Sequence, residues 1–355
     1  MIESQTLKTL SDAARAPLSS WVARYPGYRP MGYLCSYVPE EIVHAAGFTP
    51  VRLRGTTTPL RQVDTHLQSF TCALCRSTLD QLLGGEFDFL AGTVFSHTCD
   101  TMQAQADLWR TNTQPSHFVD SIMQPANLGA PAARPYLIAE LRRFSERLAS
   151  FSGRPVAENA LRASISLYDK TRQLVGALQV VRGQLATTVY FSVLDAAQRM
   201  PREEFNPLLA ELLAELGAES QDDEPRQDSA PRLFLVGAVL DEPRLLDLVE
   251  EMGAQVVGDD LCSASRHFLD QVGAKGHPIE NLADYYLRRP PCPTKFHPDH
   301  DPGRWLIEQA AHARADGVVF ALLKFCEPHA FDYALVRPLL EVAQMLGDDP
   351  PHQRI

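Results

Sequence analysis

Seven cysteines are the residues of this chain whose type and spacing could do chemistry. Four of them end or follow apolar runs that predict buried strands. These are Cys35 in GYLC, Cys99 after FDFLAGTVF, Cys262 in QVVGDDLC and Cys326 in GVVFALLKFC. Because ligands of open α/β sheets bind outside the carboxyl ends of the strands, we expect these thiols to meet in one crevice.

Two further cysteines, Cys72 and Cys75, form a C-x-x-C pair in FTCALCRS, directly before an expected helix TLDQLL. The positive end of a helix lowers the pKa of a thiol, and the thiolate is the form that binds metal. The pair alone would also suit a thioredoxin-like redox site. A zinc half-site is less well matched, because no second closely spaced cysteine pair follows.

Widely spaced single cysteines after strands favour an iron-sulfur cluster. Iron in such clusters prefers thiolates, and its ligands can come from distant positions of a sequence. Structural zinc remains an alternative. For any one cysteine, so does a role as a small buried hydrophobic residue.

The elements that must position the first thiols form an alternating pattern. GYLCSY predicts a strand, PEEIVHAAG a helix and TPVRLRG a second strand. FDFLAGTVF predicts a third strand, followed by a helix that begins near Asp100 and by the strand FVDSIMQP. This order of elements is typical of a parallel sheet.

The second half of the chain repeats this construction. Long helical periods come first, and then RLFLVGAVL, QVVGDDLC and ADGVVFALLKFC predict strands. The sequence therefore predicts an α/β fold of two Rossmann-like, flavodoxin-like parallel-sheet domains with a bridging helical region. The expected parts are an N-terminal helical segment at 1–27, a first α/β domain at 28–132, a helical region at 133–218, a linker at 219–231 and a second α/β domain at 232–355.

Composition narrows the possible partners. Lys and Arg number 33 against 44 Asp and Glu, which gives a net charge of -11. This balance argues against nucleic acid and against an anionic membrane surface, so an anionic ligand would need a local basic pocket. With no apolar run of about 18 residues and no secretory signal, we expect a cytoplasmic protein. Neither a G-x-G-x-x-G after the first strand nor a G-x-x-x-x-G-K-[ST] occurs, so any ATP-driven step belongs to another protein.

Several motifs together resemble the 2-hydroxyacyl-CoA dehydratase family, which also includes benzoyl-CoA reductase subunits and double-cubane cluster proteins. The resemblance spans most of the chain. The motifs are MGYLCSYVPEEIVHAAGFTPVRLRG, CALCRSTLDQLL, FDFLAGTVFSHTCDTMQAQADLWR, VVGDDLCSASR, RRPPCP and GVVFALLKFCEPHAFDYALVRPLLE.

The resemblance implies a set of cluster ligands. Cys72, Cys99 and Cys326 match the positions that hold one [4Fe-4S] cluster and leave one iron open to water, hydroxide or a substrate oxygen. Three other cysteines fall in further family motifs, and all six together match the requirement of a double-cubane [8Fe-9S] cluster. These three are Cys35, Cys262 and Cys292. Cys75 is then the thiol outside the set.

Two other side chains are candidates for catalysis. Glu41 follows Cys35 closely and could serve as an acid or base at the crevice, although a carboxylate in a first helical turn also stabilises the helix. His97 precedes Cys99 by two residues and is flanked by Ser96 and Thr98, so these side chains could hydrogen-bond cluster sulfurs or cap the loop. Arg52, Arg54 and Arg76 could meet the phosphates of a coenzyme A chain, with surface salt bridges as the alternative.

The resemblance further implies an enzyme, either a lyase that removes water from a 2-hydroxyacyl-CoA by a radical route or an iron-sulfur reductase. One low-potential electron would reach the thioester carbonyl from the cluster. An ATP-hydrolysing iron-sulfur activator would supply it. The chain would pair with itself or with a homologous subunit. Two alternatives stay open, a double-cubane reductase of small molecules and a non-catalytic cluster-binding subunit.

Overall fold

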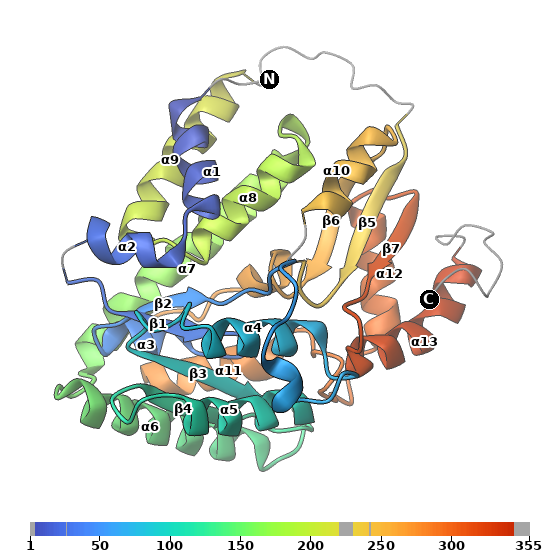
Figure 1. Ribbon diagram of the computed structural model, residues 1–355. Helices are drawn as coiled ribbons and strands as arrows, with labels where there is room; N and C mark the ends of the chain where they lie inside the picture. The colour runs from blue at the N-terminus through green and yellow to red at the C-terminus, as the bar shows by residue number, and fades with distance from the viewer. Residues whose placement is uncertain (1–3, 26, 220–229, 241–242, 344–355) are drawn as a thin grey trace.

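Two separate parallel sheets form the frame of the protein (Figure 1), a computed structural model that describes residues 4–25, 27–219, 230–240 and 243–343. Both sheets alternate with helices, so the expected α/β class with two Rossmann-like sheets is confirmed. Most of the expected linker, residues 220–229, lies outside the described residues. In the described ranges, no helix combines the length and the apolar character needed to cross a membrane.

The first sheet has the strand order β2-β1-β3-β4. Its strands are β1 Pro30–Tyr33, β2 Thr49–Arg52, β3 Gly92–His97 and β4 Phe118–Met123. The chain crosses between them through α3 Glu40–Ala45, α4 Ala73–Leu83 and α5 Asp100–Asn112. Nearly every residue of these strands is buried, which explains why they read as apolar runs without a polar alternation.

The second sheet has the order β6-β5-β7, so β5 lies in its centre. Its strands are β5 Arg232–Gly237, β6 Gln255–Leu261 and β7 Gly317–Ala321. The helices α10 Arg244–Glu251, α12 Pro302–His312 and α13 Glu327–Val342 belong to this half. Helix α11 Pro278–Arg288 instead packs on α6 Ala133–Ser152 and α7 Glu158–Val180 in the core of the first sheet. Gly237 lets β5 and β7 approach, because a Cβ atom there would lie 2.3 Å from the carbonyl oxygen of Ala321.

Helices from the N-terminus and the middle of the chain connect the two sheets. They are α1 Gln5–Arg15, α2 Leu18–Arg24, α6 Ala133–Ser152, α7 Glu158–Val180, α8 Thr187–Ala197 and α9 Arg202–Glu219. Helix α1 packs on α8 and α9 (Figure 1). One buried apolar cluster runs from α1 through α7, α8 and α9 to the second sheet, whereas α6 is buried in the core of the first sheet.

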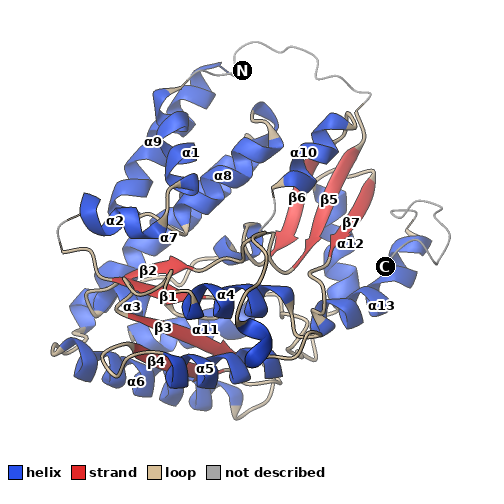
Figure 2. Ribbon diagram, in the orientation of Figure 1, coloured by secondary structure: helices blue, strands red, loops and turns tan. Residues whose placement is uncertain are grey.

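The carboxyl ends of the strands of both sheets point toward the region between the sheets (Figure 2). In each sheet the strand that comes first in the chain lies between the next two, β1 between β2 and β3 and β5 between β6 and β7. The chain therefore leaves β1 and β5 toward one edge of the sheet and later returns to add a strand on the other side, which makes a topological switch point beside each of these strands. Such switch points are where open α/β sheets bind ligands. The fold therefore directs the segments that follow β1, β3, β6 and β7 into one shared region.

Candidate functional site

A cavity of about 660 Å³ lies at the meeting point of the strand ends, and all seven cysteines line it. None of them forms a disulfide. The volume falls within the ~300–1,000 Å³ that is common for small-molecule and cofactor sites. The structure thus brings together the six thiols expected as ligands, from positions as distant as Cys35 and Cys326, and adds Cys75 beside them.

Three of these cysteines, Cys72, Cys99 and Cys326, occupy the position just before a helix and are here called the helix-end group. Cys72 precedes α4, Cys99 precedes α5 and Cys326 precedes α13. Backbone N–H groups in the first turns of these helices hydrogen-bond the sulfur atoms. Three positive helix ends therefore face one cavity, which favours a bound anionic group.

Within the helix-end group, Cys72 is the thiol most ready to ionise. The thiols of Cys326 and Cys75 hydrogen-bond the Cys72 sulfur and, together with the amides of α4, lower its pKa to about 3. Cys75 is fully buried, and its hydrogen bond to Cys72 together with its burial raises its pKa well above the usual value. Cys75 is therefore a neutral hydrogen-bond donor to Cys72.

The other three cysteines, Cys35, Cys262 and Cys292, lie on loops that buried arginines hold together, and are here called the arginine-held group. Arg52, which is 1% exposed, donates from Nη1 to the carbonyl oxygen of Cys262 at 2.7 Å and from Nη2 to that of Leu34 at 3.1 Å. The hydroxyl of Ser36 also donates to the Cys262 carbonyl, at 2.7 Å. The loop after β1 is thereby joined to the loop after β6.

The third loop of this group is fixed by two more buried arginines. Arg266 forms an ion pair with Asp260 and donates from Nη1 to the carbonyl oxygen of Pro291 at 3.0 Å. Arg289 donates to the backbone carbonyls of Ser36, at 2.8 Å, and of Arg266. The residue before Cys292 is thus tied to the same network that holds Cys35 and Cys262.

The charge balance around the cavity suits an anionic occupant. Arg52 lines the cavity, and Arg289 donates to the carbonyl oxygen of Ser36, which lines it; both arginines are buried, and within the described residues neither has a carboxylate as ion-pair partner. The two carboxylates in the lining, those of Asp100 and Glu327, are exposed. Burial raises the pKa of Cys99 to about 11 and that of Cys262 to about 12, so these thiols need a cation before they ionise. A buried positive charge without a counter-ion is costly, and a cluster carrying several thiolates would neutralise it.

The donor set fits an iron-sulfur cluster better than a single ion. Thiolates are soft ligands of the kind that such clusters use. Among the residues that the structure describes, no three histidine, cysteine or carboxylate side chains are gathered so as to hold one metal ion. A cluster instead distributes its thiolates over several iron atoms, as thiols spread around a cavity would require.

The structure does not place Glu41 at this cavity, which corrects its expected role as an acid or base there. Glu41 is fully buried and forms an ion pair with Arg172, and the same arginine also pairs with Asp169. Its neighbour Glu40 is likewise occupied, by Arg202 at 2.9 Å. Both carboxylates therefore connect α3 to the helical region rather than to the thiols.

His97 is also turned away from the cavity, against the expectation that it would contact cluster sulfurs. Its Nδ1 lies 3.0 Å from the sulfur of Met123 on the neighbouring strand β4. The next residue, Thr98, faces the thiols instead, with its hydroxyl 3.7 Å from the Cys35 sulfur. Thr98 faces the thiols and His97 does not because successive side chains of an extended chain point to opposite sides.

Three residues of the site were not predicted from the sequence. The hydroxyl of Thr294 donates to the Cys292 sulfur at 3.5 Å. Buried His329 lines the cavity from the first turn of α13, and burial lowers its pKa to about 4, so its ring is neutral. The amino group of Lys295 donates to the carbonyl oxygen of Gln124 next to the arginine-held group. The sequence signal that could have indicated two of them is their distance from a cysteine: Thr294 lies two residues after Cys292, and His329 lies three residues after Cys326.

Of the arginines proposed to meet phosphates, only Arg52 reaches the thiol cavity. Arg54 forms an ion pair with Asp195 at 2.8 Å and lines a different cavity. Arg76 forms an ion pair with the exposed Asp64.

The chain is similar in sequence to several known proteins. A family model described as 2-hydroxyglutaryl-CoA dehydratase, D-component, matches residues 35–345. The (R)-phenyllactyl-CoA dehydratase beta subunit of Clostridium sporogenes is 27% identical over 321 residues, covering 89% of this chain and 84% of that protein. A benzoyl-CoA reductase subunit of Thauera aromatica is 29% identical, with 90% and 83% covered. The lactoyl-CoA dehydratase subunit beta of Anaerotignum propionicum is 28% identical, with 86% and 81% covered.

Proposed function

Because the chain belongs to the family of the 2-hydroxyglutaryl-CoA dehydratase D-component, we propose that it is an iron-sulfur enzyme subunit that dehydrates or reduces an acyl-CoA. The observation that carries the proposal is the single cavity lined by every cysteine of the chain. Relatives named as dehydratases and as a reductase support the reaction class, since each name specifies a coenzyme A thioester.

In this proposal the helix-end group, Cys72, Cys99 and Cys326, holds a [4Fe-4S] cluster. When bound, the cluster supplies the low-potential electron for radical chemistry at the thioester carbonyl. The helix ends and the backbone N–H groups stabilise its negative charge.

The chain's own residues would also control access to the cavity. Phe70, Phe325 and Phe331 line it and are all partly exposed, so they surround an opening with apolar surface. Excluding water strengthens electrostatic interactions inside a site and prevents side reactions of reactive intermediates. The hydroxyls of Thr98 and Thr294, which lie near thiol sulfurs, would adjust the reduction potential by hydrogen bonding.

Cysteine variants purified without oxygen test the ligand assignment. We expect Cys72→Ala, Cys99→Ala and Cys326→Ala each to lose the brown absorbance and the iron. Cys75→Ala is the matched control, because Cys75 lines the same cavity as a neutral thiol, and it should keep most of both. Iron and sulfide analysis with electron paramagnetic resonance measures the outcome. A colourless Cys75→Ala together with an intact Cys326→Ala would refute the assignment.

A second candidate is a double-cubane [8Fe-9S] reductase of small molecules. The specific observation in its favour is the second set of three thiols, Cys35, Cys262 and Cys292, held by arginines in the same cavity. Iron content separates the two candidates, since one cubane gives about four irons per chain and two give about eight. In the double cubane, Cys262→Ala would lose iron as readily as Cys326→Ala. In the single cubane, it would retain it.

We further propose that the enzyme works with two protein partners. One is a second subunit of the same family, as the word "subunit" in the names of its relatives suggests, or a second copy of this chain. The other is an ATP-hydrolysing iron-sulfur activator. A cluster-binding subunit without turnover is the remaining alternative. Substrate-dependent product formation by the purified chain, with activator and ATP, would exclude it.

A further inference from the structure

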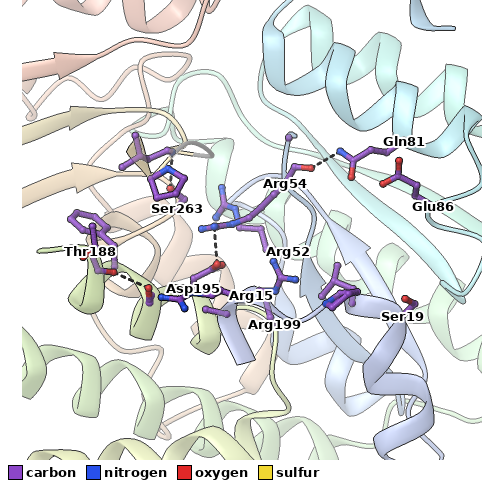
Figure 3. A pocket seen from close by; sticks show the side chains of 18 of the residues that line it. Arg15, Ser19, Arg52, Arg54, Gln81, Glu86, Thr188, Asp195, Arg199 and Ser263 are labelled. Atoms are coloured by element: carbon purple, nitrogen blue, oxygen red, sulfur yellow. Dashed lines mark hydrogen bonds and ion pairs between the residues drawn. The ribbon is translucent and has the colours of Figure 1, made fainter. Parts of the chain in front are cut away.

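A second cavity, of about 730 Å³, lies on the other side of Arg52 from the thiols. Six regions line it, namely the end of α1 and start of α2, the segment at the end of β2, the end of α4 with the turn that follows, α8 with the segment after it, the start of α10, and the segment after β6. Figure 3 shows arginine side chains from three of these regions converging there. No cysteine lines this cavity, so it is distinct from the cluster site.

Arginines dominate the polar lining. Arg52, Arg54 and Arg199 surround one buried carboxylate, that of Asp195 (Figure 3). Arg54 donates to Oδ2 of Asp195 at 2.8 Å, whereas Oδ1 has no hydrogen-bond partner among the residues that the structure describes. Arg199 donates to the backbone carbonyl of Ala16 and to no carboxylate within the described residues. Three guanidinium groups thus face a single buried negative charge.

This excess of positive charge is unusual in a chain with a net charge of -11. The lining also includes the exposed Arg15 and Glu86 and the half-buried Asp247, so its arginines still outnumber its carboxylates. Burial lowers the pKa of Arg199, and Asp195 counteracts this only in part. Like charges held close together in a partly desolvated cavity destabilise the empty site. An anion with several oxygens would relieve the repulsion, and guanidinium groups bind phosphate oxygens in pairs.

Apolar side chains make up much of the remaining wall. They are Leu18, Phe87, Phe89, Phe191, Leu240 and Leu246. Phe89 and Phe191 are only partly buried, so they leave aromatic surface available to a ligand. A small inorganic anion would not use this surface. A cavity that combines converging charged groups with aromatic surface instead suits an organic ligand that carries phosphate.

We propose that this cavity binds a nucleotide-type ligand, with its phosphate groups on Arg54 and Arg199 and its base or chain against the phenylalanines. Two sources share this chemistry, the coenzyme A part of a thioester substrate and a free adenine nucleotide. The coenzyme A source rests on the proposed function, whereas the free nucleotide does not.

The position of the cavity gives such a ligand a route to influence the thiols. Arg52 lines both cavities, and it holds the carbonyl oxygens of Leu34 and Cys262 on the thiol side. Ser263 lines the nucleotide-type cavity and directly follows Cys262. A bound ligand would therefore affect the loops that carry two thiols of the arginine-held group, Cys35 and Cys262.

Isothermal titration calorimetry on the full chain, purified without oxygen, tests the proposal without requiring turnover. The probes are coenzyme A, ADP and inorganic pyrophosphate. We expect coenzyme A or ADP to bind, and Arg199→Gln to weaken that binding at least tenfold, which corresponds to about 1.4 kcal/mol. Arg110→Gln is the matched control, since Arg110 forms an exposed ion pair with Asp107 on α5 and should bind like the parent chain.

A second variant, which should increase the affinity, distinguishes loss of a phosphate contact from damage to the fold. Asp195→Asn removes the competing carboxylate, so it should tighten phosphate binding, and a damaged fold would not do this. Coenzyme A binding at least tenfold more tightly than ADP would identify the substrate as the source. Equal affinity would identify a free nucleotide. Binding of pyrophosphate alone, no binding of any probe at millimolar concentration, or an unchanged affinity in Arg199→Gln would overturn the proposal.

Discussion

Arg52 shows how much one side chain contributes to the site. Its guanidinium donates to two backbone carbonyls and also contacts Ser36 and Gln198, at 3.2 and 3.1 Å. These contacts join the first sheet, the helical region and the second sheet at a single point. Arginine suits this position because its planar group offers several donors in fixed directions, whereas an ammonium group does not.

Replacing this arginine should damage both stability and cluster content. We expect Arg52→Gln to lower the melting temperature, because each hydrogen bond from a buried charged group contributes about 1.5–3 kcal/mol. Arg52→Lys should restore little of the loss. Thermal unfolding with iron analysis measures both effects. Arg304→Gln, which removes only an exposed pair with Glu308, is the control and should match the parent chain. A normal melting temperature in Arg52→Gln would contradict the assigned role.

For single residues, the sequence predicted which cysteines gather at the site more accurately than it predicted the directions of the Glu41 and His97 side chains. Six thiols were expected in one crevice, and the structure places all six there. Glu41 and His97 were chosen because they lie near cysteines along the chain. Their direction depends on partners far away in sequence, Arg172 for the first and Met123 for the second. No local pattern carries that information.

The strands of the second sheet set the position of the Cys326 loop. β7 pairs with β5 and ends five residues before that cysteine, and the pairing brings Gly237 opposite Ala321. Helix α13 then begins directly after Cys326. Any change that separates β5 from β7 will therefore move one member of the helix-end group.

Gly237→Ala tests whether the close pairing of β5 and β7 fixes the position of the Cys326 loop. The added methyl group would meet the carbonyl oxygen of Ala321 at 2.3 Å, and backbone cannot yield as a flexible side chain can. We expect a loss of roughly 1–3 kcal/mol in the free energy of unfolding, typical of overpacking, together with reduced iron content.

Gly176→Ala is the matched control for this substitution. Gly176 lies inside α7 with open space around its Cβ position, so alanine should raise stability by up to about 1 kcal/mol through its helix propensity. Urea unfolding of both variants gives the comparison. Equal stability of the two would show that the β5–β7 contact does not limit the fold.

Most elements could be predicted from the sequence, because their strands are short apolar runs and their helices carry recognisable ends. The start of β3 was less accessible. FDFL is as apolar as the strand that follows, yet β3 begins only at Gly92. Phe87 is buried because it stacks on Trp109, with ring centroids 5.8 Å apart. Phe87 thus belongs to the core although it lies in a turn, and its apolar side chain alone does not distinguish a turn from a strand.

For the molecule as a whole, α13 presents a line of exposed apolar side chains that the thiol site does not explain. Its exposed side chains recur every three or four positions, as on one face of a helix, and this set is here called the α13 stripe. The α13 stripe consists of Phe331, Leu335, Leu339 and Val342. It continues to the opening of the thiol cavity, where Phe331 and Phe325 lie. Exposed apolar patches of this kind mark protein interaction sites.

We expect the second family member of the complex to pack on the α13 stripe and to close the cavity. Leu335→Asp should then weaken association at least tenfold without changing the melting temperature of the isolated chain, because Leu335 is 72% exposed. Analytical ultracentrifugation measures the association. Val180→Asp provides the control, since Val180 is also largely exposed but lies at the end of α7. Unchanged association in Leu335→Asp would exclude this face.

The hydrogen-bonded thiols at the start of α4 also determine how the protein must be handled. With no iron bound, the Cys72 thiolate has the thiols of Cys75 and Cys326 within hydrogen-bonding reach. Dissolved oxygen can take two electrons from such a thiolate–thiol pair, which joins the two sulfurs; the proton of the thiol and one proton from water convert the reduced oxygen to hydrogen peroxide. Protein bleached in air would thus be blocked at a ligand position, so iron and sulfide would rebuild the centre only after a dithiol reagent had reopened it.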